Sequence, residues 1–128
     1  MTRIEGRTTG APPPAAAYSQ SVRIGSVVSV AGQIGSVPET GRLVSDDVGE
    51  QLVQAFRNVG AALAASRATL DDVVRVEVYL TDLADFAAMN ARYAEIFAPP
   101  YPTRTTVGVA LGAGAKVEVT VLAVCDAT

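Results

Sequence analysis

An arginine that directly follows a proline-rich turn is the first candidate for chemistry. Arg104 lies in the run 102–107 (PTRTTV), whose β-branched residues predict a strand. The planar guanidinium of arginine suits bidentate capture of a carboxylate. An arginine on an edge strand can equally point into water. The run by itself therefore leaves two interpretations open, a carboxylate anchor and a solvated strand residue.

A carboxylate further along the chain is the second candidate. Glu118 lies in an alternating run of charged and β-branched residues. A turn near residues 111–112 would join strands 103–110 and 116–124 in one hairpin, with Arg104 and Glu118 as near cross-strand partners. This hypothesis allows either a structural ion pair or one site that both residues line.

Two short motifs near the N-terminus are the third candidate. Tyr18-Ser19-Gln20 precedes a strand-like run, and residues 31–34 (AGQI) follow one. A glycine after a strand often marks a place where the backbone approaches another group closely. The alternative is a strand end that turns into the next loop.

The absence of histidine excludes several kinds of chemistry. Without imidazole the chain has no Ser-His-Asp or Cys-His machinery and no histidine-based metal site. The sole cysteine, Cys125, lies in an apolar run and is expected to be a buried, inert thiol. We expect no metal and no cofactor, so any catalysis has to use carboxylates, tyrosine, arginine, the backbone and water.

The charge pattern indicates which partners the chain has. Its net charge is −3, Lys116 is its only lysine, and its arginines are scattered rather than clustered. A basic surface that could track a phosphate backbone is therefore not expected, nor is a nucleic-acid partner. No apolar run approaches the roughly 20 residues that span a bilayer, and no secretory signal is recognisable, so we expect a cytoplasmic protein without a membrane partner.

The length and the hydrophobic pattern predict a single domain of the α+β class. At 128 residues the chain is long enough for one core. Residues 1–17, rich in proline and alanine, are expected to form an irregular arm, and 18–128 the domain. The predicted order is β-β-α-β-α-β-β, with strands near 19–24, 27–31, 74–80, 103–110 and 116–124 and helices near 47–66 and 83–98.

The first helix has the clearest start signal. Asp46 and Asp47 offer N-cap oxygens, and Glu50 follows Asp47 by three residues in an arrangement like a capping box. Apolar residues then recur at the i, i+3, i+4 spacing of one helix face up to about Ser66.

The last strand predicts an oligomer. It is apolar on both sides, with Val117, Val119 and Val121 on one and Leu122 and Val124 on the other. Two helices can cover only one face of a sheet, so the second apolar face needs another subunit.

A series of motifs between residues 18 and 124 carries a resemblance to a known family. They are Tyr18-Ser19-Gln20, Ala31-Gly32-Gln33-Ile34, Pro38-Glu39-Thr40-Gly41, Gln51 with Asn58, Asp85-Phe86 with Asn90 and Tyr93, Pro102-Thr103-Arg104, and Val117-Glu118-Val119. In this order and spacing they resemble the Rid family of reactive intermediate deaminases, also called YjgF-like proteins.

The resemblance implies a fold, an assembly and an activity. It implies a chorismate-mutase-like α+β sheet with two helices on one face, in a homotrimer with sites in the clefts between subunits. It also implies hydrolysis of enamines or imines such as 2-aminoacrylate to 2-oxo acids and ammonia, as in a 2-iminobutanoate/2-iminopropanoate deaminase. The substrate is then a small molecule that carries a carboxylate.

The same resemblance assigns roles to residues. Arg104 holds the substrate carboxylate, Glu118 positions or activates the attacking water, and Tyr18 closes the cleft. The substrate-binding positions are Ala31, Gly32, Asn90 and Thr106, of which Gly32 and Asn90 contact the amino group or the water. A positioned water and a polarised C=N bond suffice for this hydrolysis without a metal or a covalent nucleophile.

Some positions differ from the family pattern. Ala17 stands where proline is frequent, Ala31 where serine is frequent, and Thr106 where cysteine is frequent; residues 111–112 are Leu-Gly instead of Leu-Pro. Two other functions therefore stay open, a non-catalytic carboxylate-binding or regulatory trimer and a pathway-specific enamine deaminase. Ribonuclease activity is disfavoured, because the chain offers neither a basic groove nor histidine.

Overall fold

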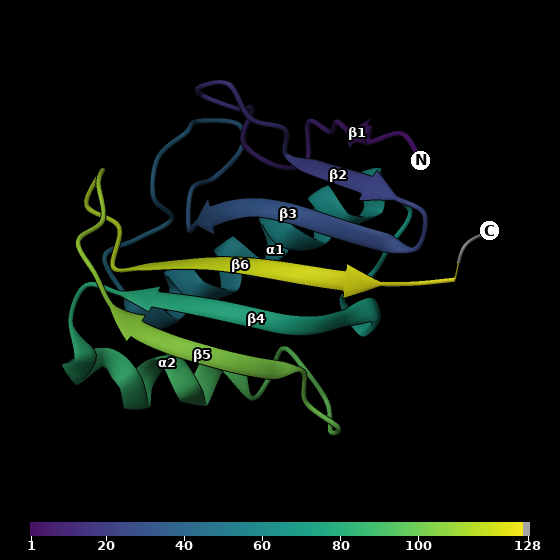
Figure 1. The fold of residues 1–128 in the computed structure, drawn as a ribbon. Coiled ribbons are helices and arrows are strands. Elements are labelled where there is room, and N and C mark those ends of the chain that lie inside the picture. Colours follow the sequence, from purple (N-terminus) through teal and green to yellow (C-terminus); the bar gives the residue numbers. More distant parts are fainter. Residues whose placement is uncertain (127–128) are drawn as a thin grey trace.

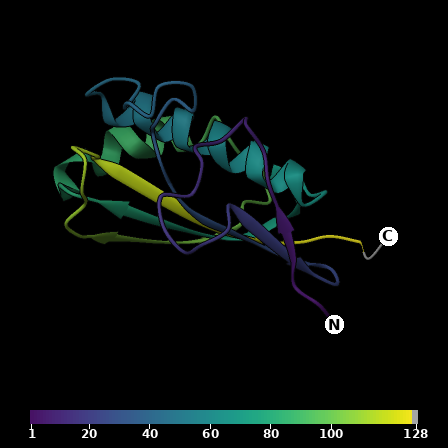
Figure 2. The same ribbon diagram turned by 90° about the horizontal axis from the view of Figure 1, so that it is seen from above.

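The computed structural model describes residues 1–126 and has an α+β fold with one mixed sheet (Figure 1). The strands are β1 (Ile4–Gly6), β2 (Ser21–Ile24), β3 (Val27–Ile34), β4 (Val73–Leu80), β5 (Thr103–Gly108) and β6 (Val117–Val124). The α-helices are α1 (Val48–Ala65) and α2 (Phe86–Tyr93), and the short 3-10 helices η1 (Leu70–Asp72) and η2 (Leu83–Asp85) precede β4 and α2. Both α-helices lie on the same face of the sheet, as predicted (Figure 2).

The long helix α1 begins where its capping residues predict. The side chain of Asp47 accepts a hydrogen bond from the amide of Glu50 at 2.8 Å, which satisfies one of the unpaired N–H groups of the first turn. The helix ends at Ala65, and Arg67 follows with a φ of 60°. Its apolar face is fully buried against the sheet, including Leu52, Val59 and Leu63.

The second helix is shorter than the sequence predicts. After Tyr93 the amides of Glu95 and Ile96 donate to carbonyls three residues back, those of Arg92 and Tyr93, so the helix tightens and stops well before residue 98. Phe97 then turns inward, and its ring centroid lies 5.4 Å from that of Phe56. The packing of this aromatic side chain thus takes the place of the last predicted turn.

The strand order corrects the predicted hairpin. The sheet runs β1-β2-β3-β6-β4-β5, so β4 lies between β5 and β6 (Figure 1). The connection through α2 returns β5 parallel to β4, whereas β6 pairs antiparallel with both β3 and β4. A βαβ crossover of this kind places the two strands side by side, which leaves no room for β6 between them. The hypothesis that Arg104 and Glu118 are cross-strand neighbours is therefore wrong.

The N-terminal arm contributes a strand that was not predicted. Ile4–Gly6 pairs antiparallel with β2 and forms one edge of the sheet. Gly6 fits there because a Cβ would lie 2.3 Å from Ser21 Oγ and 2.6 Å from Ser66 Oγ. The segment expected to be irregular thus extends the predicted sheet from five strands to six.

The two faces of the sheet differ in what covers them. Val117, Val119 and Val121 of β6 face α1 and are at most 4% exposed. The other face has no covering element within residues 1–126 and carries the paired side chains of Ile24, Val27 and Val124, which are 37–44% exposed. The alternation predicted for the last strand is confirmed.

Candidate functional site

Arg104 lies on the helix-covered face of the edge strand β5. It pairs with Val76, which is fully buried beneath the helices, and its own side chain is partly buried. The guanidinium carbon lies 4.6 Å from the ring centroid of Tyr93 and 5.7 Å from that of Phe86, both on α2. These distances are typical of cation–π contacts.

The guanidinium of Arg104 has no polar partner among residues 1–126. No carboxylate there lies within 4.0 Å of its nitrogens, and its side chain donates no hydrogen bond. An arginine side chain has five N–H donors in one plane. The guanidinium carbon of Arg104 lies over two aromatic rings, and none of these donors is used within residues 1–126, so they remain available to a ligand.

A depression of about 500 Å³ opens beside Arg104. Its walls come from α2, the loop after it and the start of β5: Asn90, Tyr93, Ala94, Tyr101, Pro102 and Arg104. The sequence pointed to Arg104 and Asn90 as site residues. It did not single out Tyr101, and it included Tyr93 only as part of a motif; an aromatic residue shortly before a proline-rich turn is too common a pattern to mark a site.

Two buried polar atoms of residues that line this depression, Asn90 Oδ1 and Tyr93 Oη, lack a hydrogen-bond partner in the described part of the chain. A third, Thr106 Oγ1, lies two residues after Arg104 on the same face of β5. Unpaired buried polar groups are rare and costly, so a cluster of them next to an arginine with unused donors indicates a binding site.

The phenol of Tyr93 stays neutral near neutral pH. Burial raises the pKa of Tyr93 above its ordinary value of 10.0, and the positive charge of Arg104 lowers that pKa by a smaller amount. The neutral hydroxyl can both donate and accept a hydrogen bond, unlike a phenolate.

Glu118 lies on the opposite face of the sheet from Arg104. On β6 it pairs with Ile34 and Tyr79, whereas its neighbours Val117 and Val119 point into the core. Its carboxylate lies against Gly32, where an added Cβ would come within 2.5 Å of the Glu118 Oε2 atom. The glycine in this motif is therefore explained by the close approach of a carboxylate.

Gly32 and Ala31 lie at an irregularity of the strand pairing. The register of β3 against β6 shifts between Val30 and Gln33, which is typical of a β-bulge. Both residues line a depression of about 290 Å³ on the uncovered face, together with Arg75 and Glu77 of β4. The predicted site residues Ala31, Gly32 and Glu118 thus form one group, separate from Arg104.

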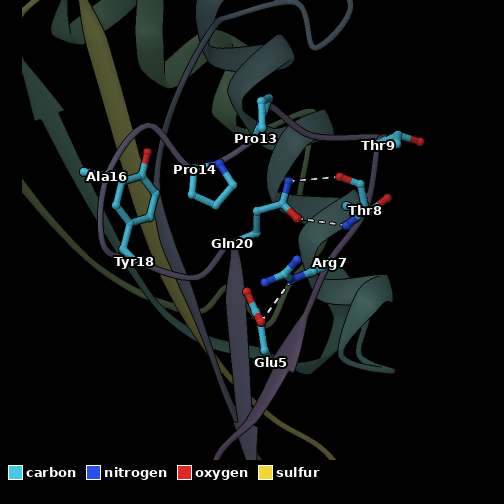
Figure 3. Close-up of a pocket in the computed structure, with 9 residues that line it drawn as sticks. All are labelled: Glu5, Arg7, Thr8, Thr9, Pro13, Pro14, Ala16, Tyr18 and Gln20. Atoms are coloured by element: carbon cyan, nitrogen blue, oxygen red, sulfur yellow. Dashed lines mark hydrogen bonds and ion pairs between the residues drawn. The ribbon is translucent and has the colours of Figure 1, made fainter.

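Tyr18 belongs to a third location, at the N-terminal arm. It is 50% exposed, and its hydroxyl accepts a hydrogen bond from the amide of Ala15 at 3.1 Å. It lines a cavity of about 610 Å³ together with arm residues such as Arg7 and Pro14 (Figure 3). The strands β3, β6 and β4 separate β2, which follows Tyr18, from β5, so one chain does not bring Tyr18 and Arg104 together.

Gln20 fixes the arm that carries Tyr18. Its side-chain oxygen accepts from the amide of Thr8 at 2.8 Å, and its nitrogen donates to the carbonyl of Thr8 at 3.0 Å (Figure 3). The same nitrogen also donates to the carbonyls of Ala11 and Pro12, at 3.2 and 2.9 Å. Gln20 is only 3% exposed. The glutamine of the Tyr18-Ser19-Gln20 motif therefore has a structural explanation.

Residues 1–126 contain neither a metal-binding cluster nor a membrane-spanning helix. No group of three or more cysteine, aspartate or glutamate side chains has a metal-binding arrangement. None of the helices in this range has the length and apolar character of a membrane-spanning segment.

Comparisons with known proteins agree with the motifs. Residues 8–125 match the family described as Endoribonuclease L-PSP. A RutC family protein of Pyrococcus abyssi is 46% identical over 102 residues, which cover 80% of each chain. A protein of Dermatophagoides farinae named 2-iminobutanoate/2-iminopropanoate deaminase is 39% identical over 117 residues and 91% of each chain.

The fold is similar to that of a solved structure as well. The crystal structure of E. coli TdcF with bound serine matches with a TM-score of 0.90 and 36% identity, over 95% of this chain and 98% of that one.

Proposed function

The chain belongs to the Rid family, and from this premise we propose that it hydrolyses imines and enamines of 2-amino acids to 2-oxo acids and ammonia. One observation carries the proposal, the depression in which Arg104 presents unused donors beside the unpartnered side-chain oxygen of Asn90. The similarity to a 2-iminobutanoate/2-iminopropanoate deaminase supports it, as does the serine bound to TdcF, since serine carries a carboxylate next to its amino group.

Each group has a defined task in this reaction. The guanidinium of Arg104 binds the substrate carboxylate through two parallel hydrogen bonds, and the side-chain oxygen of Asn90 accepts from the substrate N–H group. Water then attacks the imine carbon, so that a C–O bond forms while the nitrogen gains a proton. The proton of the new hydroxyl then moves to the nitrogen as the C–N bond breaks, so that ammonia leaves and the carbonyl forms. Glu118 accepts the proton of the attacking water and returns it to the nitrogen.

The proposed site needs two copies of the chain. Arg104 and Glu118 lie on opposite faces of the sheet, so a substrate held by Arg104 meets Glu118 only from a second copy. The uncovered face, with its exposed ladder of Ile24, Val27 and Val124, supports burial against another chain. We therefore propose a homotrimer in which Gly32, Glu118 and Tyr18 of one copy complete the Arg104 pocket of the next.

A coupled assay tests the activity. A pyridoxal-phosphate-dependent dehydratase generates 2-aminoacrylate from serine, and the loss of the imine is followed with and without the protein. Arg104→Ala is expected to lower kcat/KM by about 10²–10³, because a charge-assisted bidentate anchor is lost. The exposed Arg57 of α1 provides the matched control, and Arg57→Ala is expected to keep wild-type activity.

The outcomes of this assay separate the candidate functions. If the wild type does not accelerate the loss of any of several amino-acid-derived imines over buffer, the deaminase proposal fails. A wild type that binds 2-oxobutanoate without turnover is a carboxylate-binding protein instead. Glu118→Gln is expected to leave that binding intact and to lower kcat by about 10²–10⁴; unchanged turnover would remove Glu118 from the mechanism.

Mixing two inactive variants tests the shared site. Arg104→Ala and Glu118→Gln chains are unfolded together and refolded as a 1:1 mixture. In a ring with one Arg104–Glu118 site at each interface, about one quarter of the sites receive both native residues, so about one quarter of wild-type activity is expected. If the mixture stays inactive while the separately refolded wild type recovers, the two residues do not meet across an interface.

A further inference from the structure

The side chain of Arg104 is held by aromatic faces instead of by hydrogen bonds. Its guanidinium carbon lies 4.6 Å above the ring of Tyr93 and 5.7 Å from that of Phe86. Within residues 1–126 no carboxylate pairs with it and no carbonyl accepts from it. An arginine on a strand normally finds such a partner or extends into water. Since Arg104 does neither, we attribute the position of its guanidinium to the two rings.

Tyr93 is the fixed part of this arrangement. Only 5% of its surface is exposed, and its ring is wedged against Phe56 edge-on at 5.9 Å and against Phe97 at 5.3 Å. Phe56 belongs to the buried face of α1, so the ring is anchored in the core of the protein. Phe86 lies on the same face of α2, seven residues before Tyr93, and is 42% exposed, so it offers a looser second contact.

Contact with aromatic rings affects what the guanidinium can do. Cation–π contacts use the faces of the planar cation, and hydrogen bonds leave from its edge. A carboxylate neighbour would orient the arginine equally well, but it would occupy the donors that a ligand needs and neutralise the charge that attracts it. An aromatic face orients the cation and leaves both its edge and its charge available.

We propose that the ring of Tyr93 is a positioning element of the carboxylate-binding site, which holds the guanidinium of Arg104 in the plane that a substrate carboxylate meets. The inference rests on the proposed function for the identity of the ligand, a 2-oxo or 2-imino carboxylate. It assigns the orientation of Arg104 to the ring of Tyr93 and not to its hydroxyl, because the guanidinium carbon lies 4.6 Å from the ring centroid.

Binding of 2-oxobutanoate, measured by calorimetry on the full chain, tests the inference without requiring turnover. Tyr93→Phe keeps the ring, and its Kd is expected to stay within about twofold of the wild type. Tyr93→Leu removes the ring, and its Kd is expected to rise about tenfold, within the range that a partly desolvated cation–π contact supplies. In the imine assay the same variant should raise KM by a similar factor and change kcat little.

A control variant separates positioning from general loosening of the core. Phe97 touches the ring of Tyr93 but is not in cation–π contact with Arg104. Phe97→Leu is therefore expected to lower thermal stability as Tyr93→Leu does, with a Kd close to that of the wild type. A Kd for Phe97→Leu as weak as that of Tyr93→Leu would mean that cavity formation, and not stacking, causes the loss.

A spectroscopic signature addresses the contact directly. Protons of a side chain above an aromatic ring are shifted upfield, so the Arg104 side-chain resonances should be shifted in the wild type and in Tyr93→Phe and should move toward ordinary positions in Tyr93→Leu. The inference is overturned if Tyr93→Phe binds as weakly as Tyr93→Leu, or if Tyr93→Leu binds like the wild type. A wild type that does not bind 2-oxobutanoate also overturns it, whatever the imine assay shows; a wild type that binds but does not hydrolyse imines refutes only the proposed function.

Discussion

Two arginines on the same face of the sheet behave in opposite ways. Arg23 on β2 pairs with Val28 and is 5% exposed. Its guanidinium donates to the carbonyls of Gly25, Ser66, Arg67 and Asp126 at 2.8–3.3 Å. Arg104 on β5, also turned toward the helices, donates to no group within residues 1–126 and rests on two rings.

The difference teaches how to tell a structural arginine from a functional one. Arg23 makes four hydrogen bonds with its five donors, among them bonds to carbonyls at the end of α1 and at the C-terminal end of the described chain, so Arg23 ties these segments together. The donors of Arg104 are unused, and Asn90 and Tyr93, which line the same depression, each have an unpaired buried polar atom. Satisfaction of donors, rather than burial or residue type, distinguishes the two.

The largest expected effect is a loss of stability on replacement of Arg23, the arginine whose donors are hydrogen-bonded within the chain. Arg23→Leu leaves several partly buried carbonyls without a donor, so the free energy of unfolding should fall by about 3 kcal/mol. Urea denaturation measures this loss, with Arg57→Leu on the exposed face of α1 as the control. The activity of the molecules that remain folded should equal that of the wild type. A lower kcat/KM at full folding would contradict a purely structural role.

The second effect concerns Arg104, whose donors are unused within residues 1–126, and it appears mainly in kcat/KM. Arg104→Lys keeps the charge but loses the planar fork and the stacking face, so kcat/KM should fall about 100-fold, or ~2.7 kcal/mol. The free energy of unfolding should fall by no more than about 1 kcal/mol, because only part of the cation–π contact and no hydrogen bond within residues 1–126 is lost. If Arg104→Lys destabilises the protein as much as Arg23→Leu does, the contrast between the two residues is wrong.

A third substitution tests Gln20, another buried polar side chain whose hydrogen bonds are made within the chain. Gln20 uses both ends of its amide on the arm, so Gln20→Leu should lower the free energy of unfolding by about 2 kcal/mol. Limited proteolysis should also cut residues 8–18 faster. Thr9→Ala, an exposed neighbour on the same arm, is the control. Equal proteolysis of the two variants would show that the glutamine does not hold the arm.

The smallest expected effect is a shift in titration. Burial raises the pKa of Tyr93, so the stability that this group contributes is fully present below its unfolded value of 10.0 and is lost as the pH rises through the folded pKa. Above about pH 10 the free energy of unfolding should therefore fall more steeply for the wild type than for Tyr93→Phe. Removing the charge in Arg104→Leu should raise the pKa of Tyr93 further, as followed by phenolate absorbance, whereas Arg23→Leu should not.

The local elements were predictable because their signals are local. The cap at Asp47 and the apolar spacing after it determine α1, and alternation determines β4 and β6. The short strand β1 could not be predicted because three residues carry no periodic signal, and its pairing with β2 depends on the fit of Gly6 against Ser21. The position at which α2 ends could not be predicted because the packing of Phe97 against Phe56 and Tyr93 competes with helix propensity.

The candidate site was predictable in its members but not in its arrangement. Motif resemblance pointed to Arg104, Glu118 and Gly32 as site residues. A hairpin was the simplest connection between the last two strands, and only the position of β4 between them separates Arg104 from Glu118. Tyr93 was hidden for a similar reason, since its relation to Arg104 arises when the crossover brings α2 over β5.

The sequence by itself determined the helix and strand types, the apolar faces and the residue types available for chemistry, because these depend on neighbours a few positions away. The tertiary structure alone decided the strand order, the face on which each candidate lies, and which of two similar arginines keeps its donors unused. Those properties depend on contacts between residues far apart in the chain, such as Arg23 with Asp126 and Gly32 with Glu118. Local sequence patterns do not reveal such contacts, because the residues come together only when the sheet forms.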